Sequence, residues 1–220
     1  MFTLLILIIC NFATLMIAII DYEMGNIGSV YNMLKKIGVK SVITKEKSVI
    51  EAAEKIIIPG VGAFDSGMQQ LAKYDLISLI KKKVFQDRTP FLGICLGAQL
   101  MLESSEEGEE PGLGLLPGSV KRFDFSSIGR NLPVPCMGWN QVFINKKSNL
   151  VDNLPNEPRF YFVHSYHFKL ENQADTLMSS EYGYKYASAF ENGNIAGVQF
   201  HPEKSHKFGM ALLGNFSKLF

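Results

Sequence analysis

The chain has 220 residues, and its 22 Lys and Arg against 21 Asp and Glu give a formal net charge of +1. So even a balance argues against a nucleic-acid-binding surface or an acidic tail, because either needs a large one-sided excess of charge. Hydrophobic residues make up 47%, enough for a full core, and the length fits one large domain or two small ones. The cysteines at positions 10, 95 and 136 form neither a metal-type pair nor a disulfide framework, so we expect a reducing, cytoplasmic location.

Residues 1–20 contain no charged side chain and are about long enough to cross a bilayer, so a signal peptide or membrane anchor is one interpretation. No Lys or Arg precedes this run, and no small-residue cleavage site follows it. Residues 16–21 also fit a short buried parallel strand that ends in a polar loop. We favour the strand, with residues 1–15 as a non-essential apolar extension and residues 16–220 as the functional domain, and we expect no membrane association.

The next hundred residues alternate between helix and strand patterns. Apolar residues at helical spacing predict a helix over residues 27–38, with Asn26 as its N-cap and Gly38 as its stop signal. Further helices are expected over residues 48–54, 74–86 and 96–103, and strands over residues 39–44, 55–58 and 90–94. The lysines at 81–83 are expected on a solvated helix face. This alternation predicts an α/β fold with a parallel sheet and helices on both faces.

After residue 118 short strand patterns dominate, at residues 119–125, 138–144, 159–165, 184–190 and 195–200. An amphipathic helix follows over residues 205–220. The acidic run at residues 103–110 is expected to be a solvated surface turn. No interdomain linker or internal repeat stands out, which favours a single domain.

Cys95 stands between Gly93 and Gly97 at a predicted strand-to-helix junction. This is the Gly-x-nucleophile-x-Gly elbow, in which the glycines allow a tight turn and the nucleophile is presented at its apex. The N–H groups at the start of the following helix favour a thiolate. A buried apolar cysteine is the alternative, but the strand, the glycines and the helix together favour a nucleophile.

A thiolate nucleophile needs a base, and His201 follows the apolar strand over residues 195–200, where α/β proteins form their sites. Pro202 restricts His201 to extended geometry, in which Glu203 would point the same way as His201. Glu203 would then hold the imidazole while its second nitrogen faces Cys95. A surface turn with an incidental ion pair is the alternative.

His164 and His167 have a spacing that suggests a metal site. On a strand, however, positions three apart face opposite sides, and no Cys or carboxylate cluster joins them. We therefore expect no metal and interpret His164 as a polar core residue that supports the site.

Acyl transfer also needs donors for the developing oxyanion. The backbone N–H of Leu96 is one source, and the loop over residues 59–64 is another, because Gly60 and Gly62 allow a peptide to turn its N–H inward. A plain strand-to-helix turn is the alternative for this loop and is compatible with the same role.

Three segments, PGVGAF at 59–64, GICLGAQLM at 93–101 and GVQFHPEKS at 197–205, resemble the class I (triad) glutamine amidotransferases. Three more, DYEMGN at 21–26, MGWN at 137–140 and YFVHSY at 161–166, resemble the glutaminase subunit of imidazole glycerol phosphate synthase, an enzyme of histidine biosynthesis. The match runs in order over residues 16–220. It implies a flavodoxin-like α/β fold with a mostly parallel central sheet and a smaller antiparallel region.

The resemblance also implies a reaction that needs no cofactor. Cys95 would attack the side-chain amide of glutamine, His201 would protonate the departing ammonia and then activate water, and Glu203 would orient His201. The family's pattern places the oxyanion at Val61 and Leu96. It assigns substrate binding to Gly60, Gly62, Gln99, Ser165 and Tyr166.

Ammonia would pass through a tunnel to a cyclase subunit with a (β/α)₈ barrel, which forms a heterodimer with this chain and makes imidazole glycerol phosphate and an aminoimidazole carboxamide ribotide. Positions that the family uses near this interface are Asn26, Met137, Trp139, Tyr161 and Lys204. Two departures from the pattern, Glu23 for Gly and Cys136 for His, leave the ammonia acceptor open.

Three alternatives therefore remain. The same glutaminase chemistry can feed a sugar-modifying amidotransferase of surface-polysaccharide synthesis. A catalytically silent paralogue that acts as a binding partner is disfavoured by the complete set of Cys95, His201 and Glu203. An independent cysteine hydrolase or peptidase would not explain the segments at residues 137–140 and 161–166.

Overall fold

The structure is a computed structural model that describes residues 16–129, 132–218 and 220. The expected extension over residues 1–15 lies outside the described residues. The parallel core of the main sheet has the strand order β2-β1-β3-β4-β13. Its strands are β1 (Ile17–Ile20), β2 (Ser41–Thr44), β3 (Lys55–Gly60), β4 (Phe91–Cys95) and β13 (Ile195–Val198). This is the flavodoxin-like order, so the predicted fold class is confirmed.

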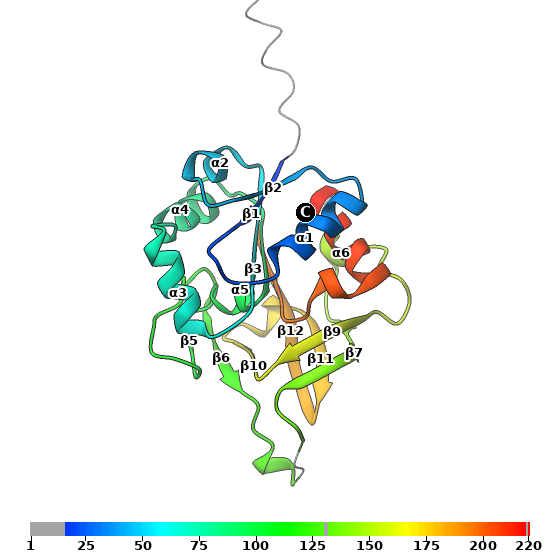
Figure 1. The fold of residues 1–220 in the computed structure, drawn as a ribbon. Helices are drawn as coiled ribbons and strands as arrows, with labels where there is room; N and C mark the ends of the chain where they lie inside the picture. Colours follow the sequence, from blue (N-terminus) through cyan, green and yellow to red (C-terminus); the bar gives the residue numbers. More distant parts are fainter. Residues whose placement is uncertain (1–15, 130–131, 219) are drawn as a thin grey trace, which may run out of the picture.

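Helices cover both faces of the parallel strands, as Figure 1 shows. One side carries α1 (Ile27–Lys36) and α6 (His206–Lys218). The other carries α2 (Lys47–Ala52), α3 (Phe64–Lys73) and α4 (Ile77–Lys81). Asn26 precedes α1, but its side chain makes no capping hydrogen bond. None of the helices in the described ranges has the length and hydrophobicity that a membrane crossing requires.

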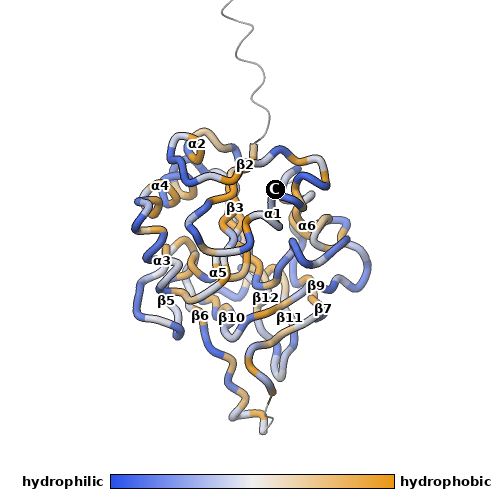
Figure 2. The backbone as a smooth tube through the Cα atoms, viewed as in Figure 1, coloured by the Kyte–Doolittle hydropathy of each residue, from blue (hydrophilic) through white to orange (hydrophobic). Residues whose placement is uncertain are grey.

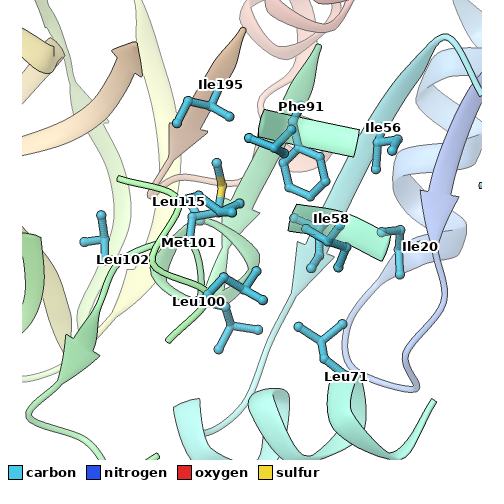
Figure 3. Packing of buried hydrophobic residues seen from close by; sticks show 14 of the residues in the cluster. Ile20, Ile56, Ile58, Leu71, Phe91, Leu100, Met101, Leu102, Leu115 and Ile195 are labelled. Carbon is cyan, nitrogen blue, oxygen red and sulfur yellow. The ribbon is translucent and has the colours of Figure 1, made fainter. Parts of the chain in front are cut away.

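The strands are apolar on both faces because each face is covered by helices. In β3, Ile56 and Ile58 pack into the core under α2, α3 and α4, whereas Ile57 packs into the core under α1 and α6. Figure 2 shows the hydrophobic central strands and the more hydrophilic outer loops. Figure 3 shows Ile56 and Ile58 with Phe91 and Leu71 in the first of these cores.

Beyond β13 the main sheet continues with antiparallel pairs in the order β12-β10-β6, and β6 pairs in parallel with β5. These strands are β12 (Tyr184–Asn192), β10 (Tyr166–Leu170), β6 (Gly118–Arg122) and β5 (Ser104–Ser105), with β11 (Thr176–Tyr182) and β8 (Phe143–Ile144) off this path. A separate antiparallel pair, β7 (Cys136–Gln141) and β9 (Arg159–His164), lies beside them (Figure 1). The expected smaller antiparallel region is therefore present.

The predicted helix over residues 74–86 is wrong in its bounds and in its surface. The segment holds α4 followed by a π-helical turn, Lys82–Gln86, and the preceding helix α3 was not predicted. Lys83 is buried rather than solvated. Its Nζ donates to the carbonyls of Glu51 and Ala53 at 2.9 and 3.1 Å, because these carbonyls at the end of α2 have no partner within that helix.

The acidic run at residues 103–110 is likewise only partly a solvated turn. The Glu107 carboxylate accepts a hydrogen bond from the backbone N–H of Phe64 at 2.9 Å, at the start of α3. In return, the Asp65 carboxylate accepts from the backbone N–H groups of Glu109 and Glu110. Free N–H groups at a helix start attract carboxylates, which explains why this run packs against α3.

Candidate active site

Cys95 occupies a strained turn between β4 and the short helix α5 (Leu96–Gln99). Its φ of 52° and ψ of −114° are unusual for a residue with a side chain and typical of functional turns. A Cβ at Gly97 would lie 1.9 Å from the carbonyl oxygen of Ile58, and one at Gly93 would lie 2.5 Å from the Cα of Ala98. Close approach of the backbone therefore requires both glycines, as the predicted elbow demands.

Sheet topology brings three predicted segments to one edge. Strand β4 lies between β3 and β13, and all three run parallel. Gly60 pairs in register with Cys95, and Val198 pairs with Ile94. Since the carboxyl ends of parallel strands share one edge, the loop after Gly60, the nucleophile and His201 meet there.

His201 and Glu203 form a buried pair, with Nδ1 and Oε1 2.8 Å apart and each side chain only 2% exposed. The predicted contact is present, but the expected extended geometry is wrong. Residues Pro202–Lys204 form a 3₁₀ turn after an extended His201, and this turn brings the carboxylate back beneath the imidazole. A carboxylate only accepts, so Nδ1 carries a proton and Nε2 is the nitrogen free to react.

The electrostatics of His201 depend on both of its neighbours. Burial disfavours the charged imidazole, but hydrogen bonding to Cys95 and to Glu203, with their negative charges, outweighs burial and raises the His201 pKa to about 10. Nε2 makes no hydrogen bond of regular geometry with any residue in the described part of the chain. Cys95 therefore acts on the charge of the imidazole, while Nε2 is a buried nitrogen that no side chain of the described residues holds in a hydrogen bond.

A cavity of about 310 Å³ opens beside Cys95, at the lower end of the range for small-molecule sites, roughly 300–1,000 Å³. It is lined by Val61, Gly62, Cys95, Leu96, Gln99, Glu107, Pro135, Val163, His164, Ser165 and Tyr166. Every predicted oxyanion and substrate residue except Gly60 is among them. Gly60 lies behind the wall, where a Cβ would meet the hydroxyl of Tyr22 at 2.2 Å. A larger open depression, about 890 Å³, lies over residues 144–152 and contains none of these residues.

Two residues at the site were missed by the sequence analysis. Glu107 brings a carboxylate into the cavity; burial raises its pKa, while the hydrogen bond from Phe64 acts in the opposite direction. Gln199 is fully buried, and its Nε2 lies 3.8 Å from Cys95 Sγ. Glu107 was missed because it belongs to the acidic run that was predicted to be a surface turn. Gln199 could have been predicted, because it lies two positions before His201 in the same strand pattern.

The rings of His164 and His167 do not face opposite sides as expected. Strand β9 ends at His164 and β10 begins at Tyr166, so the chain turns between them, and both rings lie against Phe123 at 5.2 and 4.9 Å. Burial lowers the pKa of His164 to about 3, and its Nδ1 donates to the Tyr166 carbonyl at 2.7 Å. His164 is therefore a neutral structural residue. Within the described ranges, no group of three or more potential metal ligands occurs.

Four of the five predicted interface residues gather around β7 and β9. Met137 and Trp139 are 65% and 49% exposed, and Tyr161 is the cross-strand partner of Trp139. The Nζ of Lys204 lies 5.6 Å from the Tyr161 ring centre. Asn26 is exposed at the start of α1, which packs against the 202–204 turn. The backbone carbonyl of Tyr161 accepts from His201 N–H at 2.9 Å, so this surface adjoins the candidate base.

The two departures from the family pattern are accommodated locally. Glu23 has a φ of 63° and pairs with Tyr74 and Lys73. The hydrogen bond from Tyr74, more than the lysine, lowers the Glu23 pKa. Cys136 is a buried free thiol whose pKa burial raises to about 11. A thiol of that pKa is unsuited to act as a nucleophile near neutral pH.

The fold and the site define an α/β protein with a cysteine at a nucleophile elbow and a buried His–Glu pair beside it. The family described as "Glutamine amidotransferase class-I" matches residues 18–219. The chain belongs to this family.

Curated relatives are similar over nearly their whole length. "Imidazole glycerol phosphate synthase subunit HisH 2" of Methanococcus maripaludis is 51% identical over 203 residues, which cover 92% of this chain and 99% of the relative. The protein of the same name from Pseudomonas aeruginosa is 47% identical over 93% of this chain and 100% of its own length.

Solved structures share the fold at lower identity. A "glutamine amidotransferase" aligns with a TM-score of 0.70 at 17% identity, over 92% of this chain and 99% of that one. "PurLQS from Thermotoga maritima" aligns with a TM-score of 0.68 at 17% identity, over 91% of this chain and 96% of that one.

Proposed function

We propose that the protein is the glutaminase subunit of an imidazole glycerol phosphate synthase, which hydrolyses L-glutamine to glutamate and supplies ammonia to a synthase partner. The observation that carries this proposal is the Cys95 elbow beside the buried pair of His201 and Glu203. The names of the relatives in Methanococcus and Pseudomonas support the choice of enzyme.

The reaction begins with transfer of the Cys95 proton to His201 Nε2, which leaves a thiolate beside an imidazolium. The thiolate attacks the carboxamide carbon of glutamine, and the backbone N–H groups of Val61 and Leu96 stabilise the oxyanion. The imidazolium then gives its proton to the leaving ammonia. Water attacks the resulting thioester with His201 as base, glutamate leaves, and the thiol is restored. Glu203 keeps the Nδ1–H tautomer throughout.

Substrate recognition is assigned to the cavity wall. Both N–H groups of the Gln99 amide are engaged, with Tyr166 O at 3.3 Å and Gln199 Oε1 at 3.1 Å, so Gln99 offers a ligand its oxygen. The Glu107 carboxylate suits the α-ammonium group of glutamine. By the family's pattern, the backbone around Ser165 and Tyr166, which lines the cavity, is assigned to the α-carboxylate.

The partner is proposed to be a cyclase with a (β/α)₈ barrel that docks over Met137, Trp139, Tyr161 and Lys204, with Asn26 at the rim. Large exposed apolar side chains, such as those of Met137 and Trp139, are typical of a protein interface. Direct transfer between subunits is needed because ammonia is protonated in bulk water and then has no lone pair with which to attack. No cofactor enters this scheme.

Residues 16–220 are proposed to form the catalytic unit, with residues 1–15 dispensable for glutamine hydrolysis; the family match from residue 18 supports this division. A reducing compartment, the cytoplasm, is proposed because the reaction requires Cys95 as a free thiol.

The test measures glutamate release with and without the cyclase and its ligand, and then formation of imidazole glycerol phosphate from glutamine. We expect turnover that increases with the partner and disappears in Cys95→Ala. The matched control Cys136→Ala changes the other buried thiol and should keep the activity. Undiminished hydrolysis in Cys95→Ala would refute the site. Stimulation by a sugar-modifying amidotransferase in place of the cyclase would favour the polysaccharide alternative. This alternative stays open because Glu23 and Cys136 depart from the family's pattern.

A further inference from the structure

A chain of buried amide hydrogen bonds leads from a backbone carbonyl to the sulfur of Cys95. Gln99 Nε2 donates to Tyr166 O at 3.3 Å and to Gln199 Oε1 at 3.1 Å. Gln199 Nε2 in turn donates to Cys95 Sγ at 3.8 Å. Gln99 is 5% exposed and Gln199 is fully buried, so solvent does not replace these contacts.

The Tyr166 carbonyl, at one end of this series of hydrogen bonds, fixes the donor and the acceptor of each bond. A backbone carbonyl only accepts, so Gln99 must present its NH₂ group to Tyr166 O. The second hydrogen of that NH₂ faces Gln199, which must therefore offer Oε1. Only the NH₂ group of Gln199 is then left to face the sulfur. His164 Nδ1 also donates to Tyr166 O, at 2.7 Å, and so holds the anchor in place.

A thiolate at this position needs side-chain help. Cys95 is 7% exposed, and burial disfavours an uncompensated negative charge. Helix α5 has only four residues, so its dipole is small. His201 Nε2 forms no hydrogen bond with the sulfur or with any other described residue. A fixed N–H donor on the sulfur supplies what these elements do not.

We propose that Gln199 is a positioning residue that stabilises the Cys95 thiolate through its N–H group and holds Gln99 in its substrate-facing rotamer. The proposal rests on the proposed function in taking Cys95 as the nucleophile. Thiolate formation, however, is measured without glutamine. Failure of either assignment is therefore recognised separately.

The experiment follows the pH dependence of Cys95 alkylation by iodoacetamide in the full chain, with the Cys95 peptide quantified by mass spectrometry. Other titratable groups around the sulfur are His201 with Glu203 and Tyr22 from the loop after β1. Glu107, His164 and Tyr166 line the same cavity. All of them remain in the variants, so the comparison of Gln199→Met with the wild type isolates the amide.

Gln199→Met keeps the length of the side chain and removes the donor. A hydrogen bond to a charged group is worth about 1.5–3 kcal/mol, so the alkylation midpoint should rise by about one to two pH units. Gln199→Glu keeps the acceptor for Gln99 but puts a second negative charge at the sulfur, and its midpoint should rise at least as far. The control Gln173→Met removes an exposed amide whose Nε2 donates to the Leu170 carbonyl, and should leave the midpoint unchanged.

Unchanged midpoints in either Gln199 variant, with far-ultraviolet circular dichroism showing folded protein, would overturn the proposal. A raised midpoint in a protein that never hydrolyses glutamine would overturn the proposed function and support the role of Gln199. If Gln199→Met does not fold, Gln199→Leu decides the question, because it also removes the donor and adds no charge at the sulfur.

Discussion

Replacing Glu203 by Gln tests the triad most directly, because it removes one charge from a buried pair and changes little else. Glu203 Oε1 accepts from His201 Nδ1 at 2.8 Å, and both side chains are 2% exposed. The amide of Glu203→Gln can present its NH₂ group instead, which would place the ring proton on Nε2. That tautomer cannot accept the Cys95 proton, so we expect the variant to lose most of its glutaminase activity.

The magnitude follows from the raised pKa of His201. Against the opposing effect of burial, Cys95 and Glu203 together raise this pKa from 6.5 to about 10, which corresponds to about 5 kcal/mol. In Glu203→Gln the charged partner of His201 Nδ1 is lost, and a hydrogen bond to a charged group contributes about 1.5–3 kcal/mol, so we expect a loss on the order of 2–3 kcal/mol. Because the folded-state pKa lies above the unfolded value, this stabilisation is complete below pH 6.5 and is lost as the pH rises toward 10.

Urea unfolding at about pH 6 and about pH 10 measures the difference. The wild type should lose about 2–3 kcal/mol more unfolding free energy over this interval than Glu203→Gln. Glutamine hydrolysis at neutral pH should fall by about two to four orders of magnitude, as when the orienting acid of other triads is replaced. Glu157→Gln, which alters an exposed ion pair with Arg159, should change neither quantity. Parallel pH profiles for the wild type and Glu203→Gln would refute the reasoning.

Three further predictions concern the structure around the site and the end of α2, and each is measured by urea unfolding. In Gly97→Ala the new Cβ would lie 1.9 Å from a carbonyl of β3, so a loss above about 3 kcal/mol is expected. Gly28→Ala in α1 meets nothing within 4 Å and should gain up to about 1 kcal/mol; equal effects would contradict the packing of the elbow. The buried Tyr22 hydroxyl has no hydrogen-bond partner in the described part of the chain, so Tyr22→Phe should be neutral or stabilising by about 1 kcal/mol, and a clear loss would reveal a partner. Lys83→Met should lower the free energy of unfolding by about 1–3 kcal/mol, and Lys81→Met by less than about 0.5 kcal/mol. Similar values for the two variants would indicate that Lys83 is solvated, as the sequence predicted.

The parallel core was predictable because its pattern is local. Ile56, Ile57 and Ile58 are consecutive apolar residues, a pattern typical of a strand covered by helices on both sides. The structure places Ile57 in one core and Ile56 and Ile58 in the other. Helix α3 was missed although Phe64, Met68 and Leu71 follow helical spacing. Gly67 weakens that pattern in isolation, but in the fold it allows α3 to approach Leu100, where a Cβ would be 2.9 Å away.

The buried charges were not predictable because they depend on distant partners. Lys83 bonds carbonyls some thirty residues earlier in the chain, and nothing near it in sequence distinguishes it from the lysines at 81 and 82. Glu107 turns inward because the start of α3 offers a free N–H group. The sequence of the acidic run does not show which of its carboxylates meets this N–H group.

The triad and the amide chain differ in how topology creates them. Each triad segment follows a buried strand, so any fold that places β3, β4 and β13 side by side in parallel brings Cys95 and His201 to one edge. The contact of Gln199 with Cys95 requires more, because it depends on the pairing of Val198 with Ile94. A slip of one residue would turn Gln199 to the other face of the sheet while leaving His201 near the same edge. Strand order therefore determines where the proposed triad forms, and strand register determines whether Gln199 reaches the sulfur.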